Sequence, residues 1–348
     1  MDAVRGADAR SLRAVVNQLF GANPLSREAA HALMQHILQG EMSPEDILRF
    51  LIAYNEREIT EEELSGFLRA VRDAASTIPL PSEIAEKAID IVGTGGDRSG
   101  SVNVSTMAAF VVAGAGVPVC KHGNRSASSK CGTADVLEAL GARIELSPER
   151  VGRSVSRVGV GFAFAPAFHP AFRHVGPIRR EMGVPTIFNL LGPMANPAPV
   201  SYMLVGVADS GRVDIMARTL ATRTKRAWVV HGHGGLDELS LAGPNQVSDS
   251  NAGTIIVDGQ SIGLARADNS HLRGDDPAHN AAIVRKVLES TLHGPIRDVV
   301  VLNAAAALVV AGAARDLANG ALLATAAIDS GTARATLDAF VAETTLNS

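Results

Sequence analysis

The sequence predicts a two-part α/β protein, with a small N-terminal helical domain and a larger α/β domain whose central, mostly parallel sheet is flanked by helices. Residues 9–75 carry apolar residues at helical spacing, Pro79 and Pro81 interrupt this pattern, and short Val/Ile-rich runs then alternate with helical patterns. A chain of 348 residues that is 46% hydrophobic can form two cores. We place the domains at residues 1–80 and 81–348.

Start and stop signals mark the helices of the N-terminal part. Ser26 precedes an apolar stripe that Gly40 ends, Ser43 begins the next helix together with a proline, and Thr60 with a glutamate three residues later forms a capping box. Residues 171–195 are again helical and interrupted by prolines. We expect helices within this segment to complete the helical domain.

The second part contains apolar runs at residues 89–92, 117–120 and 228–230, each followed by a glycine-rich or polar turn. Continuous apolar strands between helices indicate a parallel sheet covered on both faces, with ligand loops at the carboxyl ends of its strands. The Ala/Val-rich residues 303–314 are expected to form a buried helix. We therefore expect the functional residues to lie in these loops.

Composition excludes several classes of protein. A net charge of −4 and only 4% aromatic residues disfavour nucleic-acid binding. The first ten residues do not resemble a signal peptide and no apolar run reaches about 18 residues, so we expect a cytoplasmic protein without membrane insertion. Cys120 and Cys131 are too few for a disulfide framework or zinc cluster, and we expect them not to form a disulfide.

The first chemical motif follows the strand at residues 89–92. Three glycines within residues 93–97 allow backbone N–H groups to approach an anion, while Ser105 and Thr106 begin a helix whose amides favour phosphate. The motif lacks the lysine of a Walker loop and the spacing of a dinucleotide fingerprint. A tight strand-to-helix turn is the structural alternative.

The second motif spans residues 121–130 and carries three cations and three serines. Such a density of charge and hydroxyl groups suits a phosphate or pyrophosphate, and Thr133 is expected to cap the following helix. A solvated basic loop is the alternative.

The third motif is Asp237-Glu238, after the strand at residues 228–230. Adjacent carboxylates repel, and Mg²⁺ removes that cost while substrate phosphates complete its coordination. An acidic helix N-terminus is the alternative. His231 and His233 are too few for a zinc site and are interpreted as loop histidines.

In this order and spacing the three motifs resemble the anthranilate phosphoribosyltransferase family. Residues 24–81 resemble its N-terminal helices, residues 179–197 its second hallmark region, and the segment from residue 272 its tail. The resemblance implies a homodimer that uses Mg²⁺ to transfer the phosphoribosyl group of phosphoribosyl pyrophosphate (PRPP) to the amine of anthranilate. Pyrophosphate is released, in the second step of tryptophan biosynthesis from chorismate.

The resemblance also assigns residues to three roles. The residues expected to bind PRPP are Gly93, Gly96, Asp97, Ser101, Asn103, Val104, Ser105, Thr106, Lys121, His122, Gly123, Asn124, Arg125, Ser126, Ala127, Ser128, Ser129 and Thr133. Those expected at anthranilate are Gly93, His122, Asn124, Arg179 and Pro193. Two Mg²⁺ ions are expected at Ser105, Asp237 and Glu238. Ser101, Val102 and Pro185 stand where the family usually has Thr, Phe and Arg, and we expect these departures to affect affinity rather than chemistry.

Two other functions remain open from the residues alone. A pyrimidine nucleoside phosphorylase would share the architecture but has no need of Asp237-Glu238 as a metal pair. A non-catalytic nucleic-acid-binding relative would require basic helices and eroded metal ligands, whereas this chain is acidic and retains both carboxylates.

Overall fold

The computed structural model describes residues 23–126 and 129–346, and these form two compact units. The helical unit contains residues 23–76 and 168–197, and the α/β unit contains residues 77–167 and 198–346. The predicted fold class is confirmed, because helices alone form the first unit and a mostly parallel sheet with helices forms the second. The part of the predicted helical stretch before residue 23 lies outside the described residues.

The helical unit is built from two segments of the chain. Its helices are α2 (Arg27–Gln39), α3 (Pro44–Glu56), α4 (Glu61–Asp73), the 3₁₀ turn η1 (Pro170–His174), α10 (Gly176–Met182) and α11 (Ile187–Met194). The predicted caps are confirmed: Ser26 Oγ accepts the Ala29 N–H at 3.3 Å, Ser43 Oγ accepts the Asp46 N–H at 3.2 Å, and Gly40 ends α2 with φ +76°.

Glu63 is a fully buried carboxylate in the helical unit. It closes the capping box of α4, because its side chain accepts the Thr60 N–H at 3.0 Å while Thr60 Oγ1 accepts the Glu63 N–H. It also accepts the Leu25 N–H at 3.0 Å and the Tyr54 hydroxyl at 2.8 Å, and it pairs with the Arg57 guanidinium. Burial raises the pKa of Glu63, but the bonds from Arg57, Leu25 and Thr60 outweigh it and hold that pKa below its usual value.

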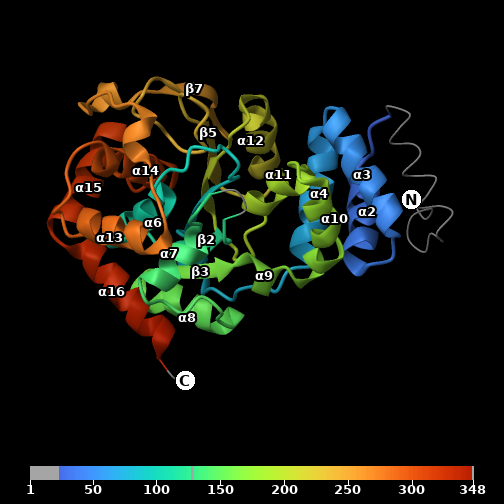
Figure 1. Cartoon of the computed structure of the whole chain (residues 1–348), viewed down its shortest axis with the longest axis horizontal. Helices are drawn as coiled ribbons and strands as arrows, with labels where there is room; N and C mark the ends of the chain where they lie inside the picture. The colour runs from blue at the N-terminus through green and yellow to red at the C-terminus, as the bar shows by residue number, and fades with distance from the viewer. Residues whose placement is uncertain (1–22, 127–128, 347–348) are drawn as a thin grey trace. The chain divides into compact units, whose positions relative to one another are not determined.

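The α/β unit contains one seven-stranded sheet (Figure 1). Its strands are β1 (Ile89–Gly93), β2 (Val119–Gly123), β3 (Val160–Phe164), β4 (Tyr202–Gly206), β5 (Arg226–His231), β6 (Asn245–Asp249) and β7 (Gly253–Val257). Their order is β3-β2-β1-β4-β5-β6-β7, with β1 to β5 parallel and β6 and β7 antiparallel. The chain therefore steps outward from β1 in both directions. The carboxyl ends of β1 and β4 lie at the point where this direction changes, which is where open α/β sheets bind ligands.

Helices cover both faces of this sheet. The helices of this unit are α5 (Ser82–Ala85), α6 (Val104–Gly114), α7 (Thr133–Ala139), α8 (Pro148–Val158), α9 (Ala165–Phe168, which ends in the helical unit), α12 (Val213–Ala221), α13 (Pro277–Leu288), α14 (Pro295–Val310), α15 (Leu317–Asp329) and α16 (Thr332–Thr345). Short 3₁₀ turns η2 (Ser210–Arg212), η3 (Gly259–Ile262) and η4 (Asn269–Leu272) lie between them. Helices α6 and α14 pack together over β1 and β4, and α12 packs against β5 on the side away from α14 (Figure 1).

Two predicted elements have different bounds in the structure. The strand predicted at residues 117–120 begins at Val119 and continues to Gly123, so Lys121 and His122 belong to β2 and not to a loop. The helix predicted to reach residue 314 ends at Val310. Cys120 and Cys131 are both described and form no disulfide, as expected.

Candidate active site

The acidic segment Asp237-Glu238 lies across the carboxyl ends of β1 and β4. A Cβ on Gly93, the last residue of β1, would lie 2.3 Å from Asp237 Oδ2. A Cβ on Gly206, the last residue of β4, would lie 1.5 Å from the Asp237 carbonyl oxygen. Both strands therefore end in glycine because the segment after β5 occupies the space that a side chain would need. The segment is a loop, which removes the alternative of an acidic helix N-terminus.

Both carboxylates are fixed by backbone amides of the first motif. The Gly95 N–H donates to Asp237 Oδ2 at 2.7 Å, and the Ser105 N–H donates to Glu238 Oε1 at 2.9 Å. The expectation that this α6 amide is available to phosphate is therefore wrong for Ser105, whose N–H already has a carboxylate partner. These two hydrogen bonds instead join the first motif directly to the third.

The environment of these carboxylates favours a cation. Burial, followed by the neighbouring charge of Asp97, raises the pKa of Asp237 to about 6. Burial and the charge of Asp237 raise the pKa of Glu238 well above its usual value. No group of three or more His, Cys, Asp or Glu side chains among the described residues could hold a metal ion. Mg²⁺ commonly takes one or two carboxylates with substrate phosphates and water, so the pair fits an ion that arrives with a phosphate ligand.

The glycine-rich loop after β1 leaves open space at its centre. Gly95 and Gly96 have φ +67° and +81°, and a Cβ on either would contact nothing within 4 Å. The loop is held at its far end, where Ser101 forms an antiparallel bridge to Arg273 and the Val102 N–H donates to the Leu272 carbonyl at 2.8 Å. Both ends of the loop are thus fixed while its middle can surround a ligand.

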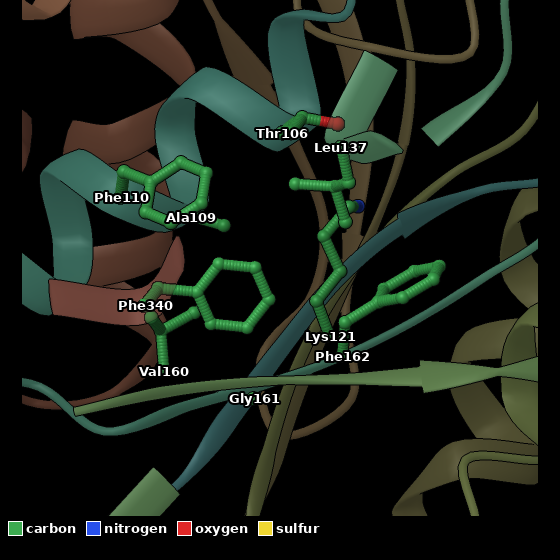
Figure 2. Close-up of a pocket in the computed structure, with 9 residues that line it drawn as sticks. All are labelled: Thr106, Ala109, Phe110, Lys121, Leu137, Val160, Gly161, Phe162 and Phe340. Atoms are coloured by element: carbon green, nitrogen blue, oxygen red, sulfur yellow. The ribbon is translucent and has the colours of Figure 1, made fainter. Parts of the chain in front are cut away.

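Lys121 connects the second motif to the first from inside the sheet. Its side chain is 3% exposed, and its ammonium donates to the Ile91 carbonyl and, at 3.1 Å, to Ser105 Oγ. Burial lowers its pKa, while the charges of Asp90, Glu238 and Asp237 oppose this effect. Figure 2 shows its aliphatic stem lining a small cavity and running toward Thr106, with the rings of Phe110, Phe162 and Phe340 also around that cavity. The apolar walls therefore aim a single charge at the start of α6.

The loop between β2 and α7 does not present three unpaired cations. Arg125 pairs with Asp135 at 2.8 Å and with Glu138 at 2.6 Å, and Lys130 pairs with Asp275 at 2.6 Å. The cations predicted in this loop are present, but carboxylates of the chain balance the charge of both exposed ones. The predicted positions Ala127 and Ser128 lie outside the described residues.

The remaining predicted positions of this loop surround the start of α7. Asn124 Oδ1 accepts the Arg125 N–H at 2.7 Å, and Ser126 Oγ lies 2.6 Å from Ser129 Oγ. Thr133 is the first residue of α7 and not its cap. The cap contact comes from Asp135, whose Oδ2 accepts the Gly132 N–H at 2.8 Å.

Asn280 joins the loops around this site, although no local pattern in the sequence marks it. This residue of α13 is 2% exposed, and its Nδ2 donates to Asn103 Oδ1 at 3.0 Å. Asn103 Nδ2 in turn donates to the Cys131 carbonyl at 3.3 Å, and Asn280 Oδ1 accepts the Asp275 N–H at 2.9 Å. Three loops are therefore joined through two side-chain amides. Asn103 and Asn280 lie 177 positions apart, so no local pattern in the sequence shows that their side chains pair.

The other predicted positions have the following surroundings. Val104 and Thr106 are buried in the first turn of α6, and Gly123 ends β2 close to Phe162 and Thr133. His122 is buried in β2, with its N–H donating to Asp90 Oδ1 at 3.0 Å. His231, the last residue of β5, lies with Nδ1 2.9 Å from the Val207 carbonyl oxygen, and the His233 ring lies against Gly243.

Arg179 and Pro193 belong to the helical unit. The Arg179 Nη2 donates to Asn189 Oδ1 at 3.1 Å, and its guanidinium lies 5.5 Å from the centre of the Phe188 ring. Asn189 Oδ1 also accepts the Thr186 N–H at 2.9 Å. This second bond holds the amide oxygen in the position where it accepts the Arg179 guanidinium. Burial lowers the pKa of Arg179. Pro193 is buried within α11.

Comparison with known proteins gives the family of this chain. Residues 85–334 match the model described as glycosyl transferase family, a/b domain, and residues 12–75 match that family's helical bundle domain. Anthranilate phosphoribosyltransferases of Afipia carboxidovorans and Thermomicrobium roseum are 47% and 49% identical to it, over 95% and 92% of this chain and 98% and 93% of theirs. The chain belongs to the anthranilate phosphoribosyltransferase family. It is therefore a member of the glycosyltransferases.

Solved structures of the family agree with this assignment. The anthranilate phosphoribosyltransferase of Thermus thermophilus is 41% identical, with a TM-score of 0.91 over 95% of this chain and 99% of that one. The Saccharomyces cerevisiae enzyme in complex with PRPP and Mg is 28% identical, with a TM-score of 0.89 over 96% and 98%. No described helix of the present chain is both long and apolar enough to cross a membrane.

Proposed function

We propose that this chain transfers the phosphoribosyl group of PRPP to anthranilate, giving N-(5-phosphoribosyl)anthranilate and pyrophosphate in tryptophan biosynthesis. The observation that carries the proposal is the joining of the motifs: Asp237 and Glu238 accept the amides of Gly95 and Ser105, and Lys121 donates to the hydroxyl of the same serine. A carboxylate pair and a buried cation thus meet beside one glycine-rich loop. The family of the chain supports the same reaction.

The reaction requires charge stabilisation more than a nucleophilic side chain. The bond from ribose C1 to the pyrophosphate oxygen breaks through an oxocarbenium-like state, a bond from C1 to the anthranilate nitrogen forms, and that nitrogen loses a proton. The protein's contribution is then to hold both substrates and to stabilise the charge that develops on pyrophosphate. The aromatic amine is neutral near pH 7 and needs positioning rather than a strong base.

We assign the binding of PRPP to the loop after β1 and to the end of β2 with its following loop. The open space above Gly95 and Gly96 supports a phosphate position at the first loop, and the direction of Lys121 supports a second contact with it. Asp97, Ser101, Asn103, Thr106 and residues 122–129, with Thr133, complete the proposed set.

We assign two Mg²⁺ ions to Ser105, Asp237 and Glu238. The raised pKa values of the two carboxylates support this assignment, because buried like charges are relieved by a divalent cation. Mg²⁺ that bridges phosphate oxygens neutralises the charge of the leaving pyrophosphate. The yeast relative was solved with PRPP and Mg.

We assign the anthranilate carboxylate to Arg179, with Gly93, His122, Asn124 and Pro193 as further proposed contacts. A planar guanidinium pairs well with a carboxylate, and the bond from Arg179 to Asn189 supports a fixed orientation of that group. The yeast family member was also solved with 4-fluoroanthranilate, a close analogue of the acceptor. We further expect a homodimer located in the cytoplasm, and light scattering of the purified chain would test the dimer.

The reaction is tested by the fluorescence of anthranilate on mixing enzyme, Mg²⁺ and PRPP, with controls that omit each component. The expected result is a loss of signal that requires all three. A signal that persists in the complete mixture contradicts the acceptor assignment, and nucleoside phosphorolysis and single-stranded nucleic-acid binding would then be measured.

A further inference from the structure

The parallel pairing between β1 and β2 ends early. In the described strands, β1 pairs with β4 at five residue positions and β2 pairs with β3 at five. By contrast, β1 pairs with β2 only where Ile89 lies opposite Val119. The two strands that lead into the phosphate loops therefore lose their regular pairing toward the carboxyl end of the sheet.

Two charged side chains take the place of the next regular hydrogen bond. If the pairing continued, Ile91 would lie opposite Lys121 and its carbonyl would accept the N–H of His122. Instead, the His122 N–H donates to Asp90 Oδ1 at 3.0 Å, and the Ile91 carbonyl accepts the ammonium of Lys121. One backbone bond has thus been exchanged for two bonds made by side chains of the same two strands.

This exchange is costly for a structural sheet. Asp90 is fully buried and Lys121 is 3% exposed. A buried carboxylate or ammonium loses its hydration, so an apolar residue in its place would commonly cost less. Ile89 and Ile91, which flank Asp90 in the strand, show what a purely structural position contains. A charged residue at position 90 therefore calls for an explanation in function.

We propose that Asp90 is a positioning residue for PRPP: by accepting the His122 N–H it keeps the ends of β1 and β2 apart and leaves the Ile91 carbonyl to hold Lys121 beside Ser105. The inference rests on the proposed function, since Lys121 and Ser105 are assigned there to PRPP and its metal. Figure 2 shows the Lys121 stem running toward the first turn of α6, the direction that this anchoring maintains.

The proposal predicts a larger effect on PRPP binding than on anthranilate binding. Without an acceptor at position 90, the His122 N–H can return to the Ile91 carbonyl and displace the Lys121 ammonium from it. The contact of Lys121 with Ser105 then loses its second anchor. The affinity for PRPP falls, while the Arg179 side chain assigned to the anthranilate carboxylate keeps its bond to Asn189. Since His122 is also a proposed contact of anthranilate, KM for anthranilate rises as well, but by less than KM for PRPP.

A matched pair of variants tests this. Asp90→Asn keeps the side-chain shape and a carbonyl oxygen that can accept the His122 N–H, whereas Asp90→Leu keeps the branched shape without an acceptor. Calorimetric titration with PRPP and Mg²⁺ gives the affinity directly, and steady-state assays give KM for both substrates. We expect Asp90→Leu to weaken PRPP binding by about tenfold, the equivalent of one hydrogen bond to a charged group. We expect Asp90→Asn to stay within about threefold of wild type, because it keeps the acceptor.

Three outcomes overturn the proposal: unchanged PRPP affinity in Asp90→Leu, an equal rise in KM for both substrates, or an Asp90→Asn variant as weak as Asp90→Leu. If the Leu variant does not fold, Asp90→Ser, whose hydroxyl is too short to reach the His122 N–H, carries the same expectation. The titration needs no turnover. Failure of the wild-type enzyme to consume anthranilate therefore refutes the proposed reaction without deciding the role of Asp90.

Discussion

Asp237 and Glu238 show a conflict between function and stability at single residues. Both are partly buried, and their pKa values are raised because desolvation and neighbouring like charge disfavour the charged form. Asp237→Asn combined with Glu238→Gln should therefore abolish turnover yet raise the melting temperature measured in EDTA, because neutral amides remove the repulsion and can still accept the Gly95 and Ser105 N–H groups. Near-normal turnover in this double variant would remove the metal role assigned to the pair.

Gly206 is required because a glycine has no side chain. Gly206→Ala would place a methyl group 1.5 Å from the Asp237 carbonyl oxygen, so the acidic segment must move. We expect at least about a hundredfold loss of kcat/KM, since displacements of about 1 Å at a catalytic site have effects of this size. Gly211→Ala is the control, because that exposed glycine has only the Asp209 side chain within reach. Similar activity in both variants would contradict the close contact.

Glu63 links one side chain to the pH dependence of the helical unit. Its pKa is below the usual value of 4.5 in the folded chain, so the stability it contributes is present above that pH and is lost as the pH falls through the lower folded value. Glu63→Gln breaks a buried ion pair with Arg57 and should destabilise this unit by about 3 kcal/mol at pH 7. Chemical denaturation at pH 7 and pH 3 measures this, and the difference between variant and wild type should shrink at pH 3. A constant difference would contradict the role of charge.

At the scale of elements, one amide pair holds three loops together. Asn280→Ala removes the donor to Asn103 Oδ1 and the acceptor of the Asp275 N–H. We expect KM for PRPP to rise by about tenfold, since a buried hydrogen-bonded network is lost, with a smaller effect on KM for anthranilate. His279→Ala, an exposed neighbour on α13, should behave as wild type. An equal loss of affinity for both substrates would point to general destabilisation.

Local signals predicted the elements better than their contacts. Ser26, Ser43 and Thr60 were identified as caps because an N-cap depends only on the residues three positions ahead. The end of β2 was missed because Lys121 and His122 are polar and resemble a loop in sequence, although both are buried. Their burial depends on partners in β1 and α6, which periodicity along a single segment cannot show.

At the scale of the molecule, the alternation of apolar runs and helices was sufficient to predict a mostly parallel sheet with a separate helical part. It did not predict the strand order, which depends on the change of direction between β3 and β4. It also did not predict that Arg125 and Lys130 are paired with carboxylates, because Glu138 and Asp275 lie 13 and 145 positions away. The charged residues of a motif are visible in the sequence, whereas the partners that pair with them are not.

The burial of Lys121 also determines which amines of the chain react with a reagent in solution. The sequence contains five lysines, and Lys87, Lys130, Lys225 and Lys286 are exposed while Lys121 is not. Brief treatment with acetic anhydride followed by peptide mass spectrometry should acetylate those four and leave Lys121 unmodified until the protein is denatured. Early acetylation of Lys121 would show that the sheet opens in solution. Selective modification of the other four lysines would yield a chain with one native lysine, the one directed at the first turn of α6.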